Sequence, residues 1–258
     1  MDISSRIEAY TRKGFMPESK FGQNFLCDGD IIDRIISLCD IGKGDKVLEI
    51  GPGLGSLSFP LASLTDNLTV VEIDKRLASF LKDDLELNAL IINEDFLKLK
   101  DYGAEDYNVV VSNLPYYVMT DIMKKLFAQC VNARKMVFMV EQDALARITA
   151  RPGTKQYGPL AVLCSLYGGL KVEFTVQRQC FYPSPNTTSC VISLAKGQQT
   201  LSEDIVRFID RCFANRRKKL VNNVKEARTA LSALGLNEQI RAEQLEPDVF
   251  IKLYNAII

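Results

Sequence analysis

The chain of 258 residues contains no histidine. This absence excludes Ser-His-Asp and Cys-His nucleophilic catalysis, histidine general bases and histidine metal ligands. The seven cysteines are scattered, odd in number and form no C-x-x-C pair, so we expect reduced thiols, without a disulfide framework or a zinc knuckle. Any chemistry must therefore depend on amides, carboxylates, aromatic rings, backbone groups or a cofactor, and we expect no metal site.

Long apolar runs are missing as well. The longest, such as "VVVS" and "MVFMV", are far shorter than the roughly 18 to 20 residues that cross a bilayer, and "MDISSRIEAYTRKG" has no apolar signal core. We therefore expect a soluble, cytosolic (cytoplasmic) protein with no membrane partner. A hydrophobic content of 47% suits one large domain, or a large domain with a small appendage.

The chain also lacks an excess of either charge, since its formal net charge is zero. A neutral chain argues against a protein that coats nucleic acid. The average conceals a basic segment between Arg207 and Arg228, with eight Lys and Arg residues against two acidic ones. This segment is predicted either to bind phosphates or to be a solvated helix face.

Strand-length apolar runs alternate with amphipathic segments of helix length up to about residue 195. This order predicts an α/β fold with a Rossmann-like, mostly parallel sheet that is covered by helices on both faces. After a helical segment, two strand-like runs separated by "CFYPSPNTT" are close enough to pair antiparallel at one edge of the sheet. The predicted strands are 46–50, 68–73, 89–93, 108–113, 135–140, 171–177 and 189–196, and the predicted helices are 55–64, 75–85, 120–130 and 157–168.

Strand patterns stop at about Lys196, and the segments 202–227, 227–235 and 246–257 are predicted to be helical. We place a boundary in "AKGQQT". The predicted domains are an α/β domain over 1–196 and a small helical domain over 197–258.

A glycine-rich turn, "VLEIGPGLGSLS", follows one predicted strand and opens the next helix. Gly51, Gly53 and Gly55 allow a sharp turn and close approach of a ligand, while the helix N-terminus offers free N–H groups. The G-x-G-x-G spacing, with Glu49 two residues ahead, favours S-adenosylmethionine over a dinucleotide because no pyrophosphate has to be held. The alternative is a tight turn without a ligand.

Acidic residues follow the next two strands. Glu72 in "VVEID" lies 21 residues after Gly51 and can accept hydrogen bonds from both ribose hydroxyls of an adenosine. Asp95 in "NEDF" is a candidate acceptor for the exocyclic amine of the cofactor's adenine, with Phe96 packing on the ring. The alternative for Asp95 is a loop cap.

The segment "SNLPYY" ends a strand with an amide, a proline and an aromatic residue. The exocyclic amine of a purine is a poor nucleophile because its lone pair is delocalised into the ring. Two acceptors, the side-chain oxygen of Asn113 and the carbonyl of Leu114, can draw that nitrogen towards tetrahedral geometry and aim its lone pair at a methyl donor. Pro115 fixes the turn and Tyr116 offers a flat face for stacking, so this chemistry needs no histidine.

A second proline-rich loop, "CFYPSPNTTS", holds Phe181 just ahead of two prolines. Phe181 is predicted either to cover the second face of an extruded base or to anchor the loop to the core.

These motifs resemble the ribosomal RNA adenine dimethyltransferases, and specifically the small-subunit type (16S rRNA adenine N6,N6-dimethyltransferase, KsgA type). The resemblance covers nearly the whole chain, and "FGQNFL" and "FANRRKKLVNNV" make it more specific than "SNLPYY" does. The matching segments are "KFGQNFLCD", "VLEIGPGLGSLS", "VVEID", "NEDFLKL", "SNLPYYV", "PGTKQYGPLAVLCSLYG", "CFYPSPNTTSCVISL" and "FANRRKKLVNNV".

The resemblance implies two sets of site residues. Asn113, Leu114, Pro115 and Tyr116 would hold the target adenine, with Phe181 on its other face, in a catalytic set. The implied cofactor is S-adenosyl-L-methionine, and its expected contacts are Asn24, Leu26, Gly51, Gly53, Glu72, Asp95 and Asn113.

The implied substrate is a pair of adjacent adenosines in a hairpin loop near the 3′ end of small-subunit rRNA, each methylated twice at N6. Loop bases suit this chemistry because they are easily splayed out. We expect a monomer that binds 16S rRNA in the small subunit or its precursor during late assembly. Arg216, Arg217, Lys218 and Lys219 are expected to contact the RNA.

The chain departs from the family pattern at two places. "EQDALAR" at 141–147 stands where the family has a segment like "QKEVAER", and Asn186-Thr187-Thr188 replaces Lys-Val-Asp. Both departures concern RNA affinity and loop detail more than the reaction.

Four alternatives remain open at this stage. They are a large-subunit rRNA dimethylase, an assembly factor in which binding matters more than methylation, a cytosine C5 methyltransferase and a nicotinamide dehydrogenase. The cytosine enzyme is disfavoured because no cysteine follows the Pro or Thr that it needs.

Overall fold

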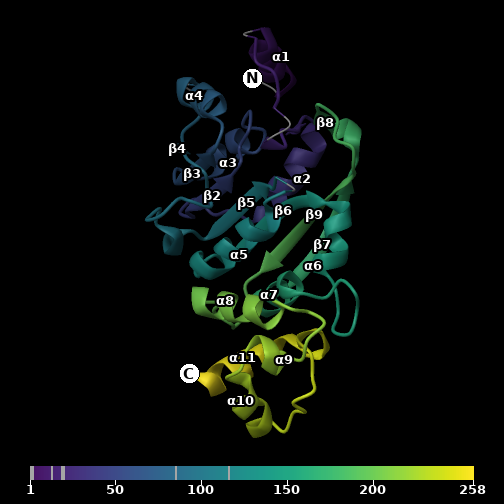
Figure 1. The fold of residues 1–258 in the computed structure, drawn as a ribbon. Coiled ribbons are helices and arrows are strands. Elements are labelled where there is room, and N and C mark those ends of the chain that lie inside the picture. Colours follow the sequence, from purple (N-terminus) through teal and green to yellow (C-terminus); the bar gives the residue numbers. More distant parts are fainter. Residues whose placement is uncertain (1–2, 13, 19–20, 85, 116) are drawn as a thin grey trace.

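Seven strands form one twisted sheet in the order β4-β3-β2-β5-β6-β9-β7, in a computed structural model that describes residues 3–12, 14–18, 21–84, 86–115 and 117–258 (Figure 1). The strands β2 to β6 run parallel to one another, whereas β9 runs antiparallel to both β6 and β7. The predicted α/β sheet and its antiparallel edge are therefore confirmed. The strands are β2 (Val47–Ile50), β3 (Leu68–Glu72), β4 (Leu90–Asn93), β5 (Val109–Asn113), β6 (Lys135–Glu141), β7 (Leu170–Val176) and β9 (Ser189–Ala195).

Helices cover both faces of this sheet, as predicted. Successive residues of β5 point to opposite faces: Val109 and Val111 pack under α2, α3 and α4, and Val110 packs with α5 and α7. The helices are α1 (Ile3–Arg12), α2 (Gly29–Cys39), α3 (Ser58–Leu64), α4 (Lys75–Asp83), α5 (Met119–Gln129), α6 (Leu145–Ile148), α7 (Pro159–Tyr167), α8 (Glu203–Cys212), α9 (Leu220–Asn223), α10 (Ala227–Ala233) and α11 (Pro247–Ile257). Short 3₁₀ turns span η2 (Ala104–Asp106), η3 (Gln142–Ala144), η4 (Arg178–Cys180) and η5 (Ala242–Gln244). No helix in the described ranges is long and apolar enough to cross a membrane.

A second, two-stranded sheet was not predicted. β1 (Phe25–Leu26) pairs antiparallel with β8 (Phe181–Tyr182), with Leu26 opposite Phe181. This pairing joins the "FGQNFL" segment to the proline-rich loop, although more than 150 residues separate them in the sequence. The pair is too short to be recognised from periodicity, so only tertiary structure reveals it.

The C-terminal helices α8 to α11 lie at the opposite end of the molecule from α1 (Figure 1). They share an apolar cluster with α5 and α7, in which Phe250 and Leu253 of α11 are fully buried. Tyr157 adds a hydrogen bond of 2.8 Å from its hydroxyl to the carbonyl of Leu245. The predicted boundary near Lys196 thus lies between parts that share a core, and the division into two domains stays a prediction.

The prediction of continuous helix over 202–227 is wrong in its middle. α8 ends at Cys212, and residues 213–219 form turns before α9 begins at Leu220. The amide nitrogen of Asn223 donates to the carbonyls of Cys212 at 2.7 Å and Asn215 at 3.3 Å, satisfying groups that a continuous helix would have bonded internally. The most basic part of the chain is therefore an exposed turn.

The N-terminal helix α1 is held by a buried arginine. Arg6 is only 3% exposed, forms ion pairs with Asp84 and Glu86, and places its guanidinium 3.3 Å from the centre of the Phe59 ring. The hydroxyl of Tyr10 donates to the carbonyl of Arg76. These contacts attach α1 to the segment 76–86, which includes most of α4.

Arg6→Ala should lower the free energy of unfolding by about 3 kcal/mol, because it leaves Asp84 without its buried partner and uncovers Phe59. Urea denaturation followed by circular dichroism measures this change. Arg12→Ala on the same helix is the matched control, since Arg12 is 79% exposed and pairs only with Glu8 among the described residues. Equal stabilities of the two variants would contradict the proposed anchor.

Candidate active site

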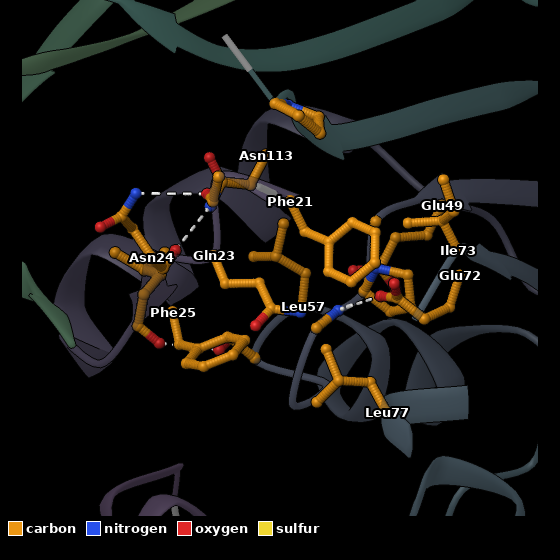
Figure 2. Close-up of a pocket in the computed structure, with 17 residues that line it drawn as sticks. Phe21, Gln23, Asn24, Phe25, Glu49, Leu57, Glu72, Ile73, Leu77 and Asn113 are labelled. Atoms are coloured by element: carbon orange, nitrogen blue, oxygen red, sulfur yellow. Dashed lines mark hydrogen bonds between the residues drawn. The ribbon is translucent and has the colours of Figure 1, made fainter. Parts of the chain in front are cut away.

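The carboxyl ends of three neighbouring parallel strands carry the predicted site. Ile50 of β2 pairs with Val71 of β3 and with Ser112 of β5, so the residues that follow each strand meet at one edge of the sheet. A cavity that is partly open to solvent lies at this edge (Figure 2). Seven of the predicted residues line it: Asn24, Leu26, Gly51, Gly53, Glu72, Asn113 and Pro115.

The glycine turn needs glycine for two reasons. Gly51 and Gly53 have φ of 69° and 59°, in the left-handed region that other residues rarely adopt. A Cβ on Gly53 would also lie 2.9 Å from the ring of Phe25. The turn therefore keeps the backbone close to the cavity, and the N–H of Gly53 donates to Glu72 Oε2 at 3.1 Å.

Glu72 is buried at the floor of this cavity, with 4% exposure. Its second carboxylate oxygen accepts a hydrogen bond of 2.8 Å from the N–H of Asp74. Burial raises the pKa of Glu72 to about 7, although the two backbone hydrogen bonds oppose that rise. Each carboxylate oxygen keeps a further lone pair, so the group can still accept from a ligand's hydroxyls.

Glu49 is a second buried carboxyl in the cavity wall, and it was not among the predicted contacts. It is 2% exposed and accepts a hydrogen bond of 2.6 Å from Ser58 Oγ. Burial raises the pKa of Glu49 to about 8, the Ser58 hydroxyl lowers it, and the charge of Glu72 raises it further. Its place two residues before Gly51 was the sequence signal that could have identified it.

Asn113 connects the motif "SNLPYY" to the N-terminal segment. Its Nδ2 donates to the carbonyl of Asn24 at 3.2 Å, which fixes the orientation of the side-chain amide (Figure 2). The predicted acceptor is the other polar atom of this amide, Oδ1. Leu114 has a buried side chain, and its N–H donates to the carbonyl of Met139 at 3.0 Å, which fixes the backbone of the motif. Tyr116 lies outside the described residues.

The segment 21–26 forms one wall of the cavity, and Gln23, which attaches it to neighbouring residues, was not among the predicted site residues. Gln23 donates to Asp74 Oδ2 at 2.8 Å and accepts from the N–H of Glu18 at 2.7 Å. Ser56 Oγ donates to the carbonyl of Leu26 at 2.7 Å. The signal for Gln23 was its place inside "FGQNFL", where only Asn24 and Leu26 were given roles. Further lining residues that were not predicted are Phe21, Phe25, Leu57, Ile73 and Leu77.

Asp95 and Phe181 do not line this cavity. Asp95 Oδ1 accepts from the N–H of Leu97 at 3.0 Å, the geometry of a loop cap, and Phe96 beside it is buried. Phe181 is 5% exposed and packs in the apolar cluster beneath α2. Their predicted contacts with adenine stay predictions, and a role for Phe181 on a base requires the loop to expose its ring.

The fold matches those of known methyltransferases. A dimethyladenosine transferase from Plasmodium falciparum superimposes with a TM-score of 0.71 at 22% identity, covering 89% of this chain and 95% of that one. The 23S rRNA methyltransferase ErmE superimposes with a TM-score of 0.63 at 22% identity, covering 91% and 99%. These likenesses and the sheet order show that the fold is the Rossmann-like fold of methyltransferases.

The family model for ribosomal RNA adenine dimethylase matches residues 14–258. The chain belongs to the ribosomal RNA adenine dimethylase family. It is 36% identical over 276 residues to a ribosomal RNA small subunit methyltransferase A from Geobacillus thermodenitrificans, covering 97% of this chain and 94% of that protein. A protein of the same name from Malacoplasma penetrans is 38% identical over 224 residues, covering 85% and 82%.

The residues of the cavity fit S-adenosylmethionine. Its lining includes the carboxyls of Glu49 and Glu72 and contains no Lys or Arg among the described residues, which suits a ligand that carries ammonium and sulfonium charges. Ile73, Leu57 and Leu77 supply apolar surface next to Glu72, as an adenosine needs.

The two buried carboxyls predict a pH-dependent stability. Because their folded pKa values lie above those of exposed carboxyls, the folded chain binds more protons than the unfolded chain, and stability is lost as pH rises from about 5 to 8. Glu49→Gln should reduce this loss by an amount on the order of a few kcal/mol. Melting temperatures of the wild type and Glu49→Gln, measured across this range, test the prediction.

Glu105→Gln, at an exposed carboxyl, is the matched control and should follow the wild-type profile. Parallel profiles for wild type and Glu49→Gln would show that Glu49 does not titrate in this range.

Proposed function

We propose that this chain dimethylates N6 of two adjacent adenosines in a hairpin loop near the 3′ end of 16S rRNA, within the small ribosomal subunit and coupled to its late assembly. The observation that carries the proposal is the position of Asn113, at the end of β5, in the wall of the cavity that holds Glu72 and the glycine turn. Full-length similarity to proteins named ribosomal RNA small subunit methyltransferase A supports the small subunit as the target.

The chain's own residues perform binding and orientation. Glu72 would hold the ribose hydroxyls, Asn24 and Leu26 would cover the methionine side of the cofactor, and Glu49 would face its positive charge. When bound, S-adenosylmethionine supplies an electrophilic methyl group. The proposed role of the Gly51–Gly53 turn is to bring the backbone against the cofactor without side-chain interference.

The target amine must be made nucleophilic and aimed. Asn113 Oδ1 and the carbonyl of Leu114 would accept its two N–H bonds, drawing its lone pair out of the ring. Each transfer would form one N–C bond in exchange for the S–CH₃ bond of the cofactor and would release one N–H proton to water, so two transfers consume both protons of N6. The nitrogen gains a positive charge as it is methylated, so its N–H proton becomes acidic. A histidine base is therefore unnecessary.

The basic turn is the proposed RNA contact outside the cavity. Four of the eight basic residues between 207 and 228 form ion pairs: Arg207, Arg211, Arg216 and Arg228. Arg216 is further held by the carbonyls of Thr154 and Lys155, so we assign it to anchoring the turn. Arg217, Lys218 and Lys219 are exposed and form no ion pair among the described residues, which leaves them available for phosphates.

Asn113→Ala should reduce methyl transfer to small subunits that lack the modification by about two orders of magnitude, because one of two acceptors is removed. Transfer of labelled methyl groups measures the rate, and isothermal titration measures cofactor binding separately. Asn88→Ala, at an exposed amide, is the matched control. Full activity of Asn113→Ala would refute its role.

Incubation of the wild type with each ribosomal subunit tests the substrate. Label in the large subunit alone would favour a large-subunit rRNA dimethylase over the enzyme proposed. If the Asn113→Ala variant, with its reduced methyl transfer, still supported maturation of the small subunit, the biological role would lie in binding during assembly and not in methylation.

Lys218→Ala or Lys219→Ala should each weaken binding to small subunits and reduce the slope of log Kd against log salt by about 1, since one phosphate contact is lost. Lys43→Ala is the matched control, because Lys43 is exposed ahead of β2, at the sheet edge opposite the cavity. Filter binding from low to moderate salt measures the slopes. Slopes equal to that of Lys43→Ala would remove the turn from the interface.

A further inference from the structure

A second cavity of about 390 Å³, open to solvent, adjoins the first. Gly22, Gln23 and Asn24 line both cavities, so the segment 21–26 forms a wall between them. The far side of the second cavity is the proline-rich loop, from Pro183 to Thr187. A volume of this size is sufficient for a nucleoside.

The lining of the second cavity suits a base and not a phosphate. Its described lining residues contain one charged side chain, Glu141, and no Lys or Arg. Prolines offer flat apolar faces, and Asn24 and Asn186 offer amides that can bind the edge of a base. A carboxylate at this point would repel a phosphate but would accept a hydrogen bond from an exocyclic amine.

Glu141 is rigidly placed at a short distance from the methylation motif. It is the last residue of β6 and pairs with Ser189 of β9, and the next residue, Gln142, donates its N–H to the carbonyl of Thr188 at 2.9 Å. Asn113 pairs with Met139, two residues earlier on the same strand, so Glu141 lies about 7 Å further along the strand direction. That spacing suits a nucleotide next to the one held by Asn113.

We propose that the second cavity holds the nucleotide adjacent to the target adenosine, and that Glu141 accepts a hydrogen bond from its exocyclic amine. The proposal rests on the proposed function and deepens it, because it names a residue that recognises the base of the adjacent nucleotide. A base with an amine at this edge is accepted, and uracil, which presents a carbonyl oxygen there, is rejected. A neighbour that is already dimethylated has no N–H to donate, so Glu141 favours pairs whose neighbour is unmodified.

Cytidine and uridine provide a matched pair for the test, since cytidine carries an amine at C4 and an acceptor at N3, whereas uridine carries a carbonyl oxygen at C4 and an N–H at N3. Small subunits are reconstituted with rRNA in which one adenosine of the pair is replaced, giving the AC, AU, CA and UA forms. The wild type should methylate AC faster than AU, or CA faster than UA, with a kcat/KM about tenfold higher for the cytidine form. This ratio is the effect expected from one charge-assisted hydrogen bond.

Glu141→Gln should abolish this preference, because an amide can turn either its oxygen or its NH₂ group towards the base. Glu105→Gln is the matched control and should keep the preference. The substrate comparison with the wild type needs no variant, so a folding defect in Glu141→Gln, detected by its melting temperature, would not remove the test.

Equal rates of the wild type on cytidine and uridine forms in both orders would overturn the proposal, as would an unchanged preference in Glu141→Gln. These results differ from failure of the proposed function, which would show as no methylation of unaltered small subunits by the wild type.

Discussion

The parallel register of β2, β3 and β5 is the constraint on which the site depends. Gly51, Glu72 and Asn113 are far apart in the sequence, and they meet only because these three strands end at the same edge of the sheet. The register is strongly fixed, since Val109, Val110 and Val111 are fully buried between helices on the two faces, and a slip by one residue would exchange those faces. Ser112 adds a buried hydrogen bond of 2.6 Å to the carbonyl of Ile50, at the last residue before the glycine turn.

The two halves of segment 21–26 are held differently, and this difference has a functional meaning. Phe25 and Leu26 are buried, and Leu26 pairs with Phe181 of β8. Gln23 and Asn24 are attached to the cavity by hydrogen bonds from Gln23 to Asp74 and from Asn113 to Asn24, each of which contributes about 1 kcal/mol. These two residues line both cavities, so one short stretch connects the two sites.

Much of this arrangement could be predicted from the sequence, because it depends on local patterns. Alternating strands and helices gave the sheet, and the glycine turn and Glu72 follow from strand ends. The bond between Gln23 and Asp74 and the pairing of β1 with β8 could not be predicted, since they join distant segments of little regularity. The turn at 213–219 was misjudged as helix because its break depends on Asn223, whose amide binds carbonyls 8 and 11 residues earlier.

The charge of the cavity decides between the two cofactor classes that a glycine turn permits. Glu49 and Glu72 are both buried, and their raised pKa values show that each resists ionisation in the absence of a nearby positive charge. A pyrophosphate would add negative charge to this environment, and no Lys or Arg among the described lining residues would balance it. A cationic cofactor has the opposite effect, because it favours the ionised carboxylates and lowers their pKa values. The buried carboxyls thus disfavour a nicotinamide dinucleotide and favour S-adenosylmethionine on electrostatic grounds, independently of the glycine spacing.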